Sequence, residues 1–186
     1  MKQILVFVGH TGAGKSTSSR YFSEKYHIPL ISFANIGKQF SQELGYASIR
    51  ECYQAIGLER FSKIFSQYFF LHLSDIFTSH DRIIIDGLYL RSVAANLKLK
   101  YNTSFIYIDV PESICHKRVA VRPGLSLDAV AAEYHIKEHM KNELGNEYLI
   151  HNADITIDGT QELHAVFDEI EQFILQRHFL FDSCLV

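Results

Sequence analysis

Short, uninterrupted apolar runs alternate along the chain with longer segments in which apolar residues recur every three or four positions. A short run rich in β-branched residues is typical of a strand buried on both faces, and the longer period is typical of a helix that packs along one face. The apolar runs predict strands at 3–8, 29–33, 82–86, 104–110 and 153–157. The periodic segments predict helices at 15–26, 35–44, 58–78, 88–100, 112–121, 127–143 and 161–177.

This alternation predicts an α/β fold, with one five-stranded parallel sheet between two layers of helices. Right-handed crossovers place the carboxyl ends of all parallel strands at one edge of the sheet, where open α/β sheets bind their ligands. The loop after the first strand, Asp86 after the third strand and Asp109 after the fourth all belong to that edge. The sequence therefore predicts that the functional groups gather there.

The loop after the first strand carries the most specific motif. Residues 9–16 read GHTGAGKS, which satisfies the pattern GxxxxGK[ST] between a strand and a helix. In this context the loop amides cradle phosphate oxygens, Lys15 bridges the β- and γ-phosphates, and the Ser16 hydroxyl binds Mg²⁺. Nucleotide contacts are predicted for Gly9, His10, Thr11, Gly12, Ala13, Gly14, Lys15, Ser16 and Thr17.

Asp86 is predicted to hold the same metal ion. It ends the apolar strand 82–86, and a carboxylate at this place in a Walker B pattern reaches the metal directly or through water. The alternative is that Asp86 caps the helix predicted to begin at Leu88, and the two roles can coexist. Asp109 is followed by Pro111 at a predicted helix start, which favours a capping role for Asp109.

Two arginines are predicted to act on the transferring phosphoryl group. Arg118 and Arg122 are four residues apart near the end of a helix, so they share one of its faces. Arginines that close over a transferring phosphoryl group stabilise its developing charge. Pro123 and Gly124 break the helix directly afterwards, and we expect a short lid at about 118–128. The alternative is a pair of solvated surface arginines.

Composition and charge narrow the class of protein. The chain has 186 residues, of which 47% are hydrophobic, and this length favours one domain. A net charge of −3 and dispersed basic residues argue against nucleic acid as a partner. Three widely spaced cysteines favour reduced thiols, and no apolar run has the length of a signal peptide or a membrane span. We therefore expect a cytoplasmic protein without a membrane partner.

With these residues placed, the chain resembles the small P-loop kinases of the nucleoside monophosphate kinase and dephospho-CoA kinase group, especially the adenylate-kinase-like proteins of archaea. The resemblance rests on the phosphate loop and on further segments, which are 85–87 with Arg91, 107–112, the Arg118/Arg122 pair, 152–157 and 159–160. It implies a three-layer P-loop NTPase fold over residues 1–177, ATP and Mg²⁺ as cofactors, acceptor-binding helices at about 34–79, and a separate tail at 178–186.

The acceptor side departs from this group in ways that bear on the substrate. The group often has an arginine where Lys38 stands. Dephospho-CoA kinases have an aspartate beyond the second strand, and residues 32–38 of this chain contain none. At the last strand, Asp158-Gly159 replaces the Asn-x-Gly of the group. A hydroxyl acceptor benefits from a positioned base, whereas a phosphate acceptor needs only cations. The sequence therefore favours a nucleoside monophosphate as acceptor. Candidate acceptor cations are Lys38, Arg50, Arg60 and Arg91.

Other functions stay open at this stage. Transfer to a hydroxyl, as in a dephospho-CoA kinase or a nucleoside kinase, is the first alternative. A regulatory nucleotide-binding NTPase and a kinase domain that modifies nucleic acid are alternatives of other classes. The stretch from His135 to His139 spells HxxEH, the zinc signature of inverzincins, but a third protein ligand cannot be assigned. The acceptor, the base preference, the oligomeric state and the role of the tail are not predicted.

Overall fold

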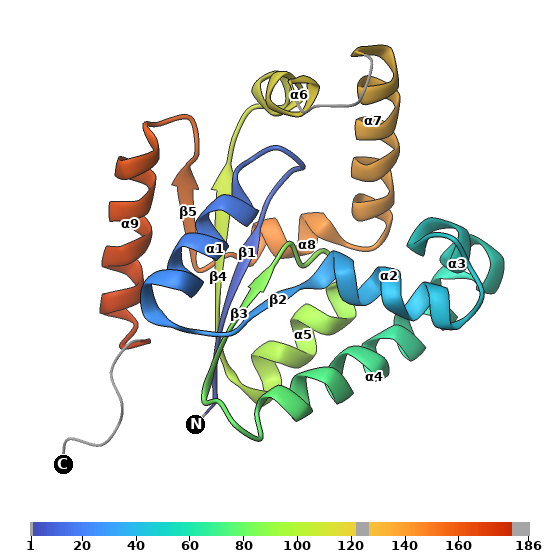
Figure 1. Ribbon diagram of the computed structural model, residues 1–186, viewed down its shortest axis with the longest axis horizontal. Coiled ribbons are helices and arrows are strands. Elements are labelled where there is room, and N and C mark those ends of the chain that lie inside the picture. The colour runs from blue at the N-terminus through green and yellow to red at the C-terminus, as the bar shows by residue number, and fades with distance from the viewer. Residues whose placement is uncertain (1, 122–126, 180–186) are drawn as a thin grey trace.

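The protein is described here by a computed structural model that covers residues 2–121 and 127–179, with the backbone alone at 127–133. Five parallel strands form one sheet in the order β2-β3-β1-β4-β5 (Figure 1). Their bounds are β1 Gln3–Val8, β2 Leu30–Ser32, β3 Arg82–Asp86, β4 Asn102–Asp109 and β5 Ile155–Asp158. The predicted α/β fold and the five-stranded parallel sheet are confirmed.

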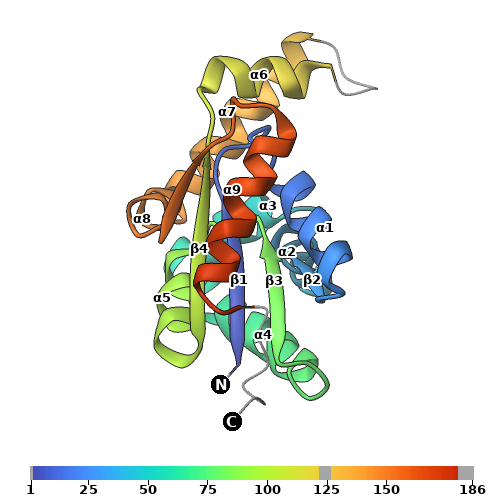
Figure 2. The ribbon, with the colours of Figure 1, turned by 90° about the vertical axis from the view of Figure 1, so that its left-hand side faces the viewer.

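Helices cover both faces of this sheet, and α6 and α7 stand beyond the carboxyl ends of the strands (Figures 1 and 2). The helices in the described part of the chain are α1 Lys15–Tyr26, α2 Phe33–Glu43, α3 Ile49–Ile56, α4 Leu58–Ile76, α5 Arg91–Lys100, α6 Glu112–Ala120, α7 Leu127–Glu143, α8 Asn146–His151 and α9 Leu163–Gln176. None of the helices in the described ranges is long and apolar enough to cross a bilayer.

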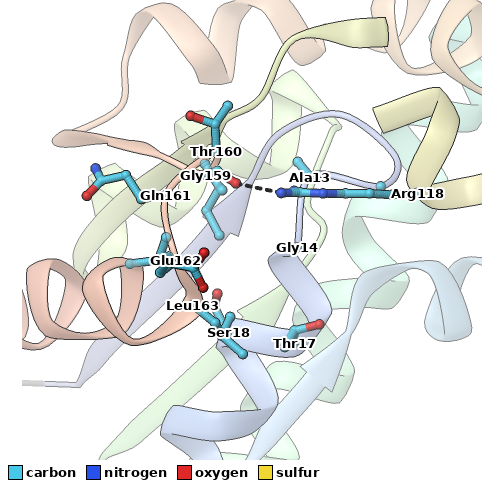
Figure 3. Close-up of a pocket in the computed structure, with 13 residues that line it drawn as sticks. Ala13, Gly14, Thr17, Ser18, Arg118, Gly159, Thr160, Gln161, Glu162 and Leu163 are labelled. Atoms are coloured by element: carbon cyan, nitrogen blue, oxygen red, sulfur yellow. Dashed lines mark hydrogen bonds between the residues drawn. The ribbon is translucent and has the colours of Figure 1, made fainter. Parts of the chain in front are cut away.

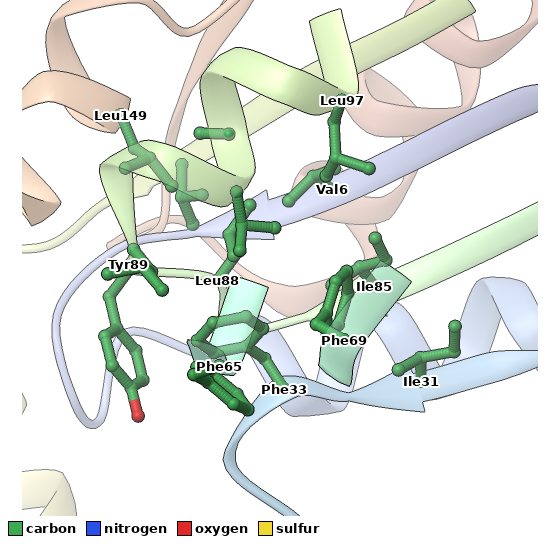
Figure 4. Packing of buried hydrophobic residues seen from close by; sticks show 14 of the residues in the cluster. Val6, Ile31, Phe33, Phe65, Phe69, Ile85, Leu88, Tyr89, Leu97 and Leu149 are labelled. Carbon is green, nitrogen blue, oxygen red and sulfur yellow. The ribbon is translucent and has the colours of Figure 1, made fainter. Parts of the chain in front are cut away.

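The central strand supplies both hydrophobic cores, because successive side chains of a strand point to opposite faces. Ile4, Val6 and Val8 of β1 join a cluster with α2 to α5 and α8, part of which is drawn in Figure 4. Leu5 and Phe7 join a second cluster with α1, α6 and α9. Burial on both faces explains why the strand reads as an unbroken apolar run.

Two short helices were not expected from the sequence. The chain forms α3 and α8 where no periodic segment was assigned. A cap marks the start of α3, because Ser48 Oγ accepts from the amide of Glu51 at 3.1 Å. The S-x-x-E spacing of Ser48 and Glu51 is a readable helix-start signal. Eight residues give too few turns for apolar periodicity, so this cap was the signal that could have revealed α3.

The tail begins against the second core. Phe179 is 4% exposed and packs with the residues of α1 and α9 in that cluster. The amide of Phe179 donates to Ile174 O at 3.2 Å, which fixes the turn after α9. The apolar character of the tail is therefore explained at this one position by burial within the chain.

Candidate active site

The phosphate loop leaves β1 at Val8 and ends at Lys15, where α1 begins. Its glycines are required by close packing as well as by backbone angles. Gly9 has φ +142° and Gly12 has φ +90°, both in the region that favours glycine. A Cβ on Gly9 would lie 2.7 Å from Ile108 O, and one on Gly12 would lie 2.6 Å from Cys115 O. The loop is thus packed against the end of β4 at Gly9 and against α6 at Gly12.

Ser16 and Asp86 meet as the sequence predicts for a metal site. Phe7 of β1 pairs in register with Asp86 of β3, which brings the end of β3 beside the loop. Ser16 Oγ donates to Asp86 Oδ2 at 2.7 Å. Asp86 Oδ1 is buried and finds no hydrogen-bond partner among the described residues. A buried carboxylate oxygen with spare capacity beside a serine hydroxyl fits Mg²⁺ and its bound water.

The two capping interpretations are wrong. The helix after β3 begins at Arg91, and its N-terminal cap position is Leu90, which offers no side-chain hydrogen bond. The helix after β4 has Pro111 at its cap position, again without a side-chain bond. Asp109 instead accepts a hydrogen bond from the Tyr107 hydroxyl at 2.9 Å. Of the two roles predicted for Asp86, binding of the metal ion is the one that remains.

Lys15 is folded back onto its own loop. Its Nζ donates to His10 O at 2.6 Å. The pKa of Lys15 is lowered to about 7, mainly by burial and in part by the nearby charge of Lys141, while the carboxylates of Asp86 and Glu138 oppose the shift. Phosphate oxygens bound beside Lys15 would favour its charged form and raise this pKa again.

A cavity of about 500 Å³ lies beside the loop, between α1 and the turn from β5 to α9 (Figure 3). It is lined by residues 12–14 and 17–18 of the loop and α1, and by 159–163 on the other side. Arg118 reaches into it from α6 and donates to Gly159 O at 3.0 Å. This size suits a nucleoside. The structure thus places Arg118 on this side of the loop, and Arg122 lies outside the described residues.

A second cavity, of about 590 Å³, lies on the other side of the metal pair. Ser16 and Asp86 form its floor, Ser32 and Asn35 at the start of α2 form one wall, and Arg20 and His72 line it as well. Ser32 pairs in register with Asp86, so the sheet itself fixes this wall. A cavity that opens onto the metal pair from the side opposite the first is suited to an acceptor.

The four candidate acceptor cations are placed in different surroundings. Lys38 and Arg60 are exposed and line neither of these two cavities. Arg50 lines a third cavity, of about 370 Å³, between α3 and α7. The Arg91 guanidinium lies 4.8 Å from the centre of the Tyr148 ring. Arg20 lines the second cavity and was missed, because a helical arginine carries no motif of its own.

Two charged residues of α7 also reach the phosphate loop, and sequence reasoning did not place them there. Glu138 is bonded to His10 and Thr11, and Lys141 is bonded to Thr11. Glu138 is the glutamate of the HxxEH stretch, so the structure gives it a partner other than a metal. The side chains of His135 and His139 are 65% and 76% exposed, beside Glu112 and Glu143. No group of three metal-ligating side chains occurs among the described residues.

The parallel sheet, the phosphate loop after its first strand and the Ser16–Asp86 pair define a P-loop kinase. The family model for shikimate kinase matches residues 11–175, and the chain belongs to the shikimate kinase family. The protein is an ATP-dependent small-molecule kinase. The expected P-loop kinase group is confirmed at this level, and the nucleoside monophosphate subgroup stays a prediction.

Individual relatives agree with this class. A cytidylate kinase from Methanosphaera stadtmanae is 25% identical over 152 residues, which cover 82% of this chain and 81% of the relative. The shikimate kinase structure from Aquifex aeolicus has a TM-score of 0.55 at 17% identity and covers 96% of this chain and 99% of that one. The shikimate kinase structure from Bacteroides thetaiotaomicron has a TM-score of 0.58 at 12% identity and covers 94% and 97%. At these identities the two structures show the fold alone.

Proposed function

We propose that the protein transfers the γ-phosphoryl group of ATP to a nucleoside monophosphate in the cavity beside Ser16 and Asp86. One observation carries the choice of acceptor. Among the described residues that line this cavity, Asp86 is the sole carboxylate, and it is bonded to Ser16. A hydroxyl acceptor would find no free carboxylate to act as base, and His72 is the other side chain of this described lining that could take its proton. A positioned base is worth about 10²–10⁴-fold in rate. A phosphate acceptor is already anionic and needs no base.

The donor triphosphate lies along the loop in this proposal. The amides at the start of α1 bind its phosphates, and Lys15 leaves His10 O to bridge the β- and γ-phosphates. Ser16 and Asp86 hold Mg²⁺, which neutralises charge on the phosphate oxygens when bound. The base occupies the cavity between the loop and Gly159, with the Arg118 guanidinium beside it. Arg122 remains a candidate for contact with the transferring group.

The acceptor phosphate needs cations on the other side of the metal pair. Arg20 lines that cavity and is the cation that we propose for the acceptor phosphate, whereas the candidates Lys38, Arg50, Arg60 and Arg91 do not line it. An in-line transfer then requires little covalent chemistry from the protein, because positioning and charge neutralisation lower the barrier. The chain's own groups therefore suffice for a transfer between two phosphates.

A hydroxyl acceptor is the second candidate, and the match to the shikimate kinase family over residues 11–175 favours it. Ser32 and Asn35 could hydrogen-bond a polyhydroxylated acid in the same cavity. In that case Asp86 would have to accept the hydroxyl proton while it holds the metal, or His72 would have to take it. The described lining holds no carboxylate that is free for this proton, and for this reason we rank the hydroxyl acceptor second.

An acceptor panel tests the proposal. Purified protein with ATP and Mg²⁺ is incubated with AMP, CMP, GMP, UMP, shikimate, nucleosides, RNA or no acceptor, and ADP release is measured. We expect at least one nucleoside monophosphate to raise ADP release well above the rate without acceptor. The Lys15→Met protein, prepared in parallel, controls for contaminating kinases. Faster turnover with shikimate or a nucleoside than with every monophosphate would overturn the proposal. ADP release that no acceptor raises above the rate without acceptor would overturn it as well.

A further inference from the structure

One face of α7 buries charged residues where a helix normally buries apolar ones. Glu138 and Lys141 are 7% and 9% exposed, one turn apart, on the same face as the buried Tyr134. Removing two charges from water is costly, and apolar residues of similar volume are often as stable or more stable in such places. A buried pair of this kind therefore calls for an explanation beyond packing.

The pair is bonded to one short stretch of the phosphate loop. Glu138 Oε1 accepts from the amide of Thr11 at 2.9 Å and from its hydroxyl at 2.6 Å, and Oε2 lies 2.7 Å from His10 Nδ1. Lys141 Nζ donates to Thr11 Oγ1 at 2.6 Å and to Glu138 Oε1 at 2.7 Å. Thr11, Glu138 and Lys141 thus form a closed ring of hydrogen bonds that fixes the ammonium group.

This ammonium group lies at the phosphate end of the loop. The cavity assigned to the base is lined by residues 12–14, whereas His10 and Thr11 are absent from its lining. Lys15 is bonded to His10 O, so both lysines are held at adjacent residues of the loop. Because His10 and Thr11 are consecutive residues, these bonds hold the two lysines close together, and the charge of Lys141 lowers the pKa of Lys15. A buried lysine and a half-buried lysine held at one place form a site for a multiply charged anion.

We propose that Lys141 contacts the terminal phosphate of the bound ATP, and that Glu138 is the positioning residue that orients Lys141 and holds His10 and Thr11. The inference rests on the ATP-dependent activity of the chain and is independent of the acceptor. When ATP binds, Lys141 exchanges its bond to the Thr11 hydroxyl for a γ-phosphate oxygen, while Glu138 keeps the loop amide. Helix α7 thereby supplies a cation that contacts the terminal phosphate of ATP. ADP lacks this phosphate and would not make the contact.

Nucleotide binding without an acceptor tests this assignment. Titration calorimetry with Mg²⁺ gives the dissociation constants of ADP and of the non-hydrolysable analogue AMP-PNP. The dissociation constant of ADP divided by that of AMP-PNP measures the contribution of the terminal phosphate. We expect Lys141→Met to reduce this ratio about ten- to a hundredfold, the range of one charge-assisted hydrogen bond. Lys141→Arg should restore most of it. Lys137→Met, an exposed lysine on the same helix, should leave the ratio unchanged.

A structural role alone gives a different result. If Lys141 only fastens α7 to the loop, Lys141→Met weakens ADP and AMP-PNP binding equally or leaves both unchanged, and either outcome overturns the proposal. If Lys141→Met is unfolded because Glu138 is left buried and unpaired, the Glu138→Gln/Lys141→Met double variant removes both charges and decides the question. A wrong acceptor in the proposed function would not affect these binding measurements.

Discussion

Single side chains at the carboxyl edge of the sheet are arranged for anions and a metal ion. Lys141 is a buried cation, Lys15 is bonded to the backbone of its own loop, and Asp86 has one oxygen bonded to Ser16 and one buried without a partner among the described residues. Each of these groups is costly to bury alone. Their cost is offset when a triphosphate and its metal ion bind, so the ligand-free site is organised for a ligand.

Asp86 is the residue at which the metal assignment can be tested most directly. Asp86→Asn keeps the size and the bond to Ser16 but removes the negative charge that Mg²⁺ needs. We expect kcat to fall about a hundredfold or more, and the Mg²⁺ concentration for half-maximal activity to rise. Asp109→Asn is the matched control, because Asp109 ends β4, the next strand along the chain, and is bonded to Tyr107. Unchanged magnesium dependence in Asp86→Asn would remove Asp86 from the site.

Among the elements, the phosphate loop is held from two sides. The segment from β4 to α6 packs against Gly9 and Gly12, and α7 bonds His10 and Thr11. Backbone packing at Gly9 and Gly12 and side-chain bonds at His10 and Thr11 thus fix the same stretch of the loop. A Cβ on Gly12 would therefore collide with α6, whereas a Cβ on Gly14 would face open space.

Gly12→Ala tests this packing. The new Cβ would lie 2.6 Å from Cys115 O and 3.0 Å from Val119 Cγ2, so the loop or α6 must shift. Gly45→Ala is the matched control, since Gly45 has φ +84° against +90° for Gly12, and nothing lies within 4 Å of its Cβ. Gly45→Ala should lose only the strain of a left-handed backbone, about 1–2 kcal/mol. Thermal unfolding should show a larger loss in Gly12→Ala, and calorimetry should show weaker ATP binding in that variant alone.

Across the whole molecule, contacts between distant segments link the nucleotide site to the stability of the fold. Glu138 meets Thr11 across 127 residues of chain, and Arg118 meets Gly159 across 41. Burial tends to raise the pKa of Glu138, but the hydrogen bond from His10 and the charge of Lys141 prevail and hold that pKa far below its usual range. The ionised carboxylate therefore stabilises the folded chain.

The sign of this effect predicts how stability depends on pH. A carboxyl group whose pKa is lower in the folded state contributes fully above its ordinary pKa of 4.5, and the contribution is lost as the pH falls further. His10 and Thr11 of the loop and Lys141 of α7 face the group. The advantage of the wild type over Glu138→Gln in melting temperature should shrink by on the order of 5 °C between pH 6 and pH 3. A constant difference would contradict the assigned pairing.

The sequence was sufficient for features that depend on residues close together along the chain. The five strands follow from apolar runs, and the phosphate loop follows from eight consecutive residues, because strand burial and loop geometry are local consequences of side-chain type. The short helices α3 and α8 were missed because they span too few turns to show a period. The pairing of Ser16 with Asp86 was foreseeable, since parallel strands end at one edge.

Packing had to be known before the remaining site residues could be placed. Glu138 and Lys141 resemble an ordinary polar helix face in the sequence, and only the orientation of α7 turns them toward His10 and Thr11. The same holds for Arg118, whose partner Gly159 is set by the position of β5. Contacts of this kind depend on where whole helices and strands settle when the two cores form, and no local pattern of residues encodes that position.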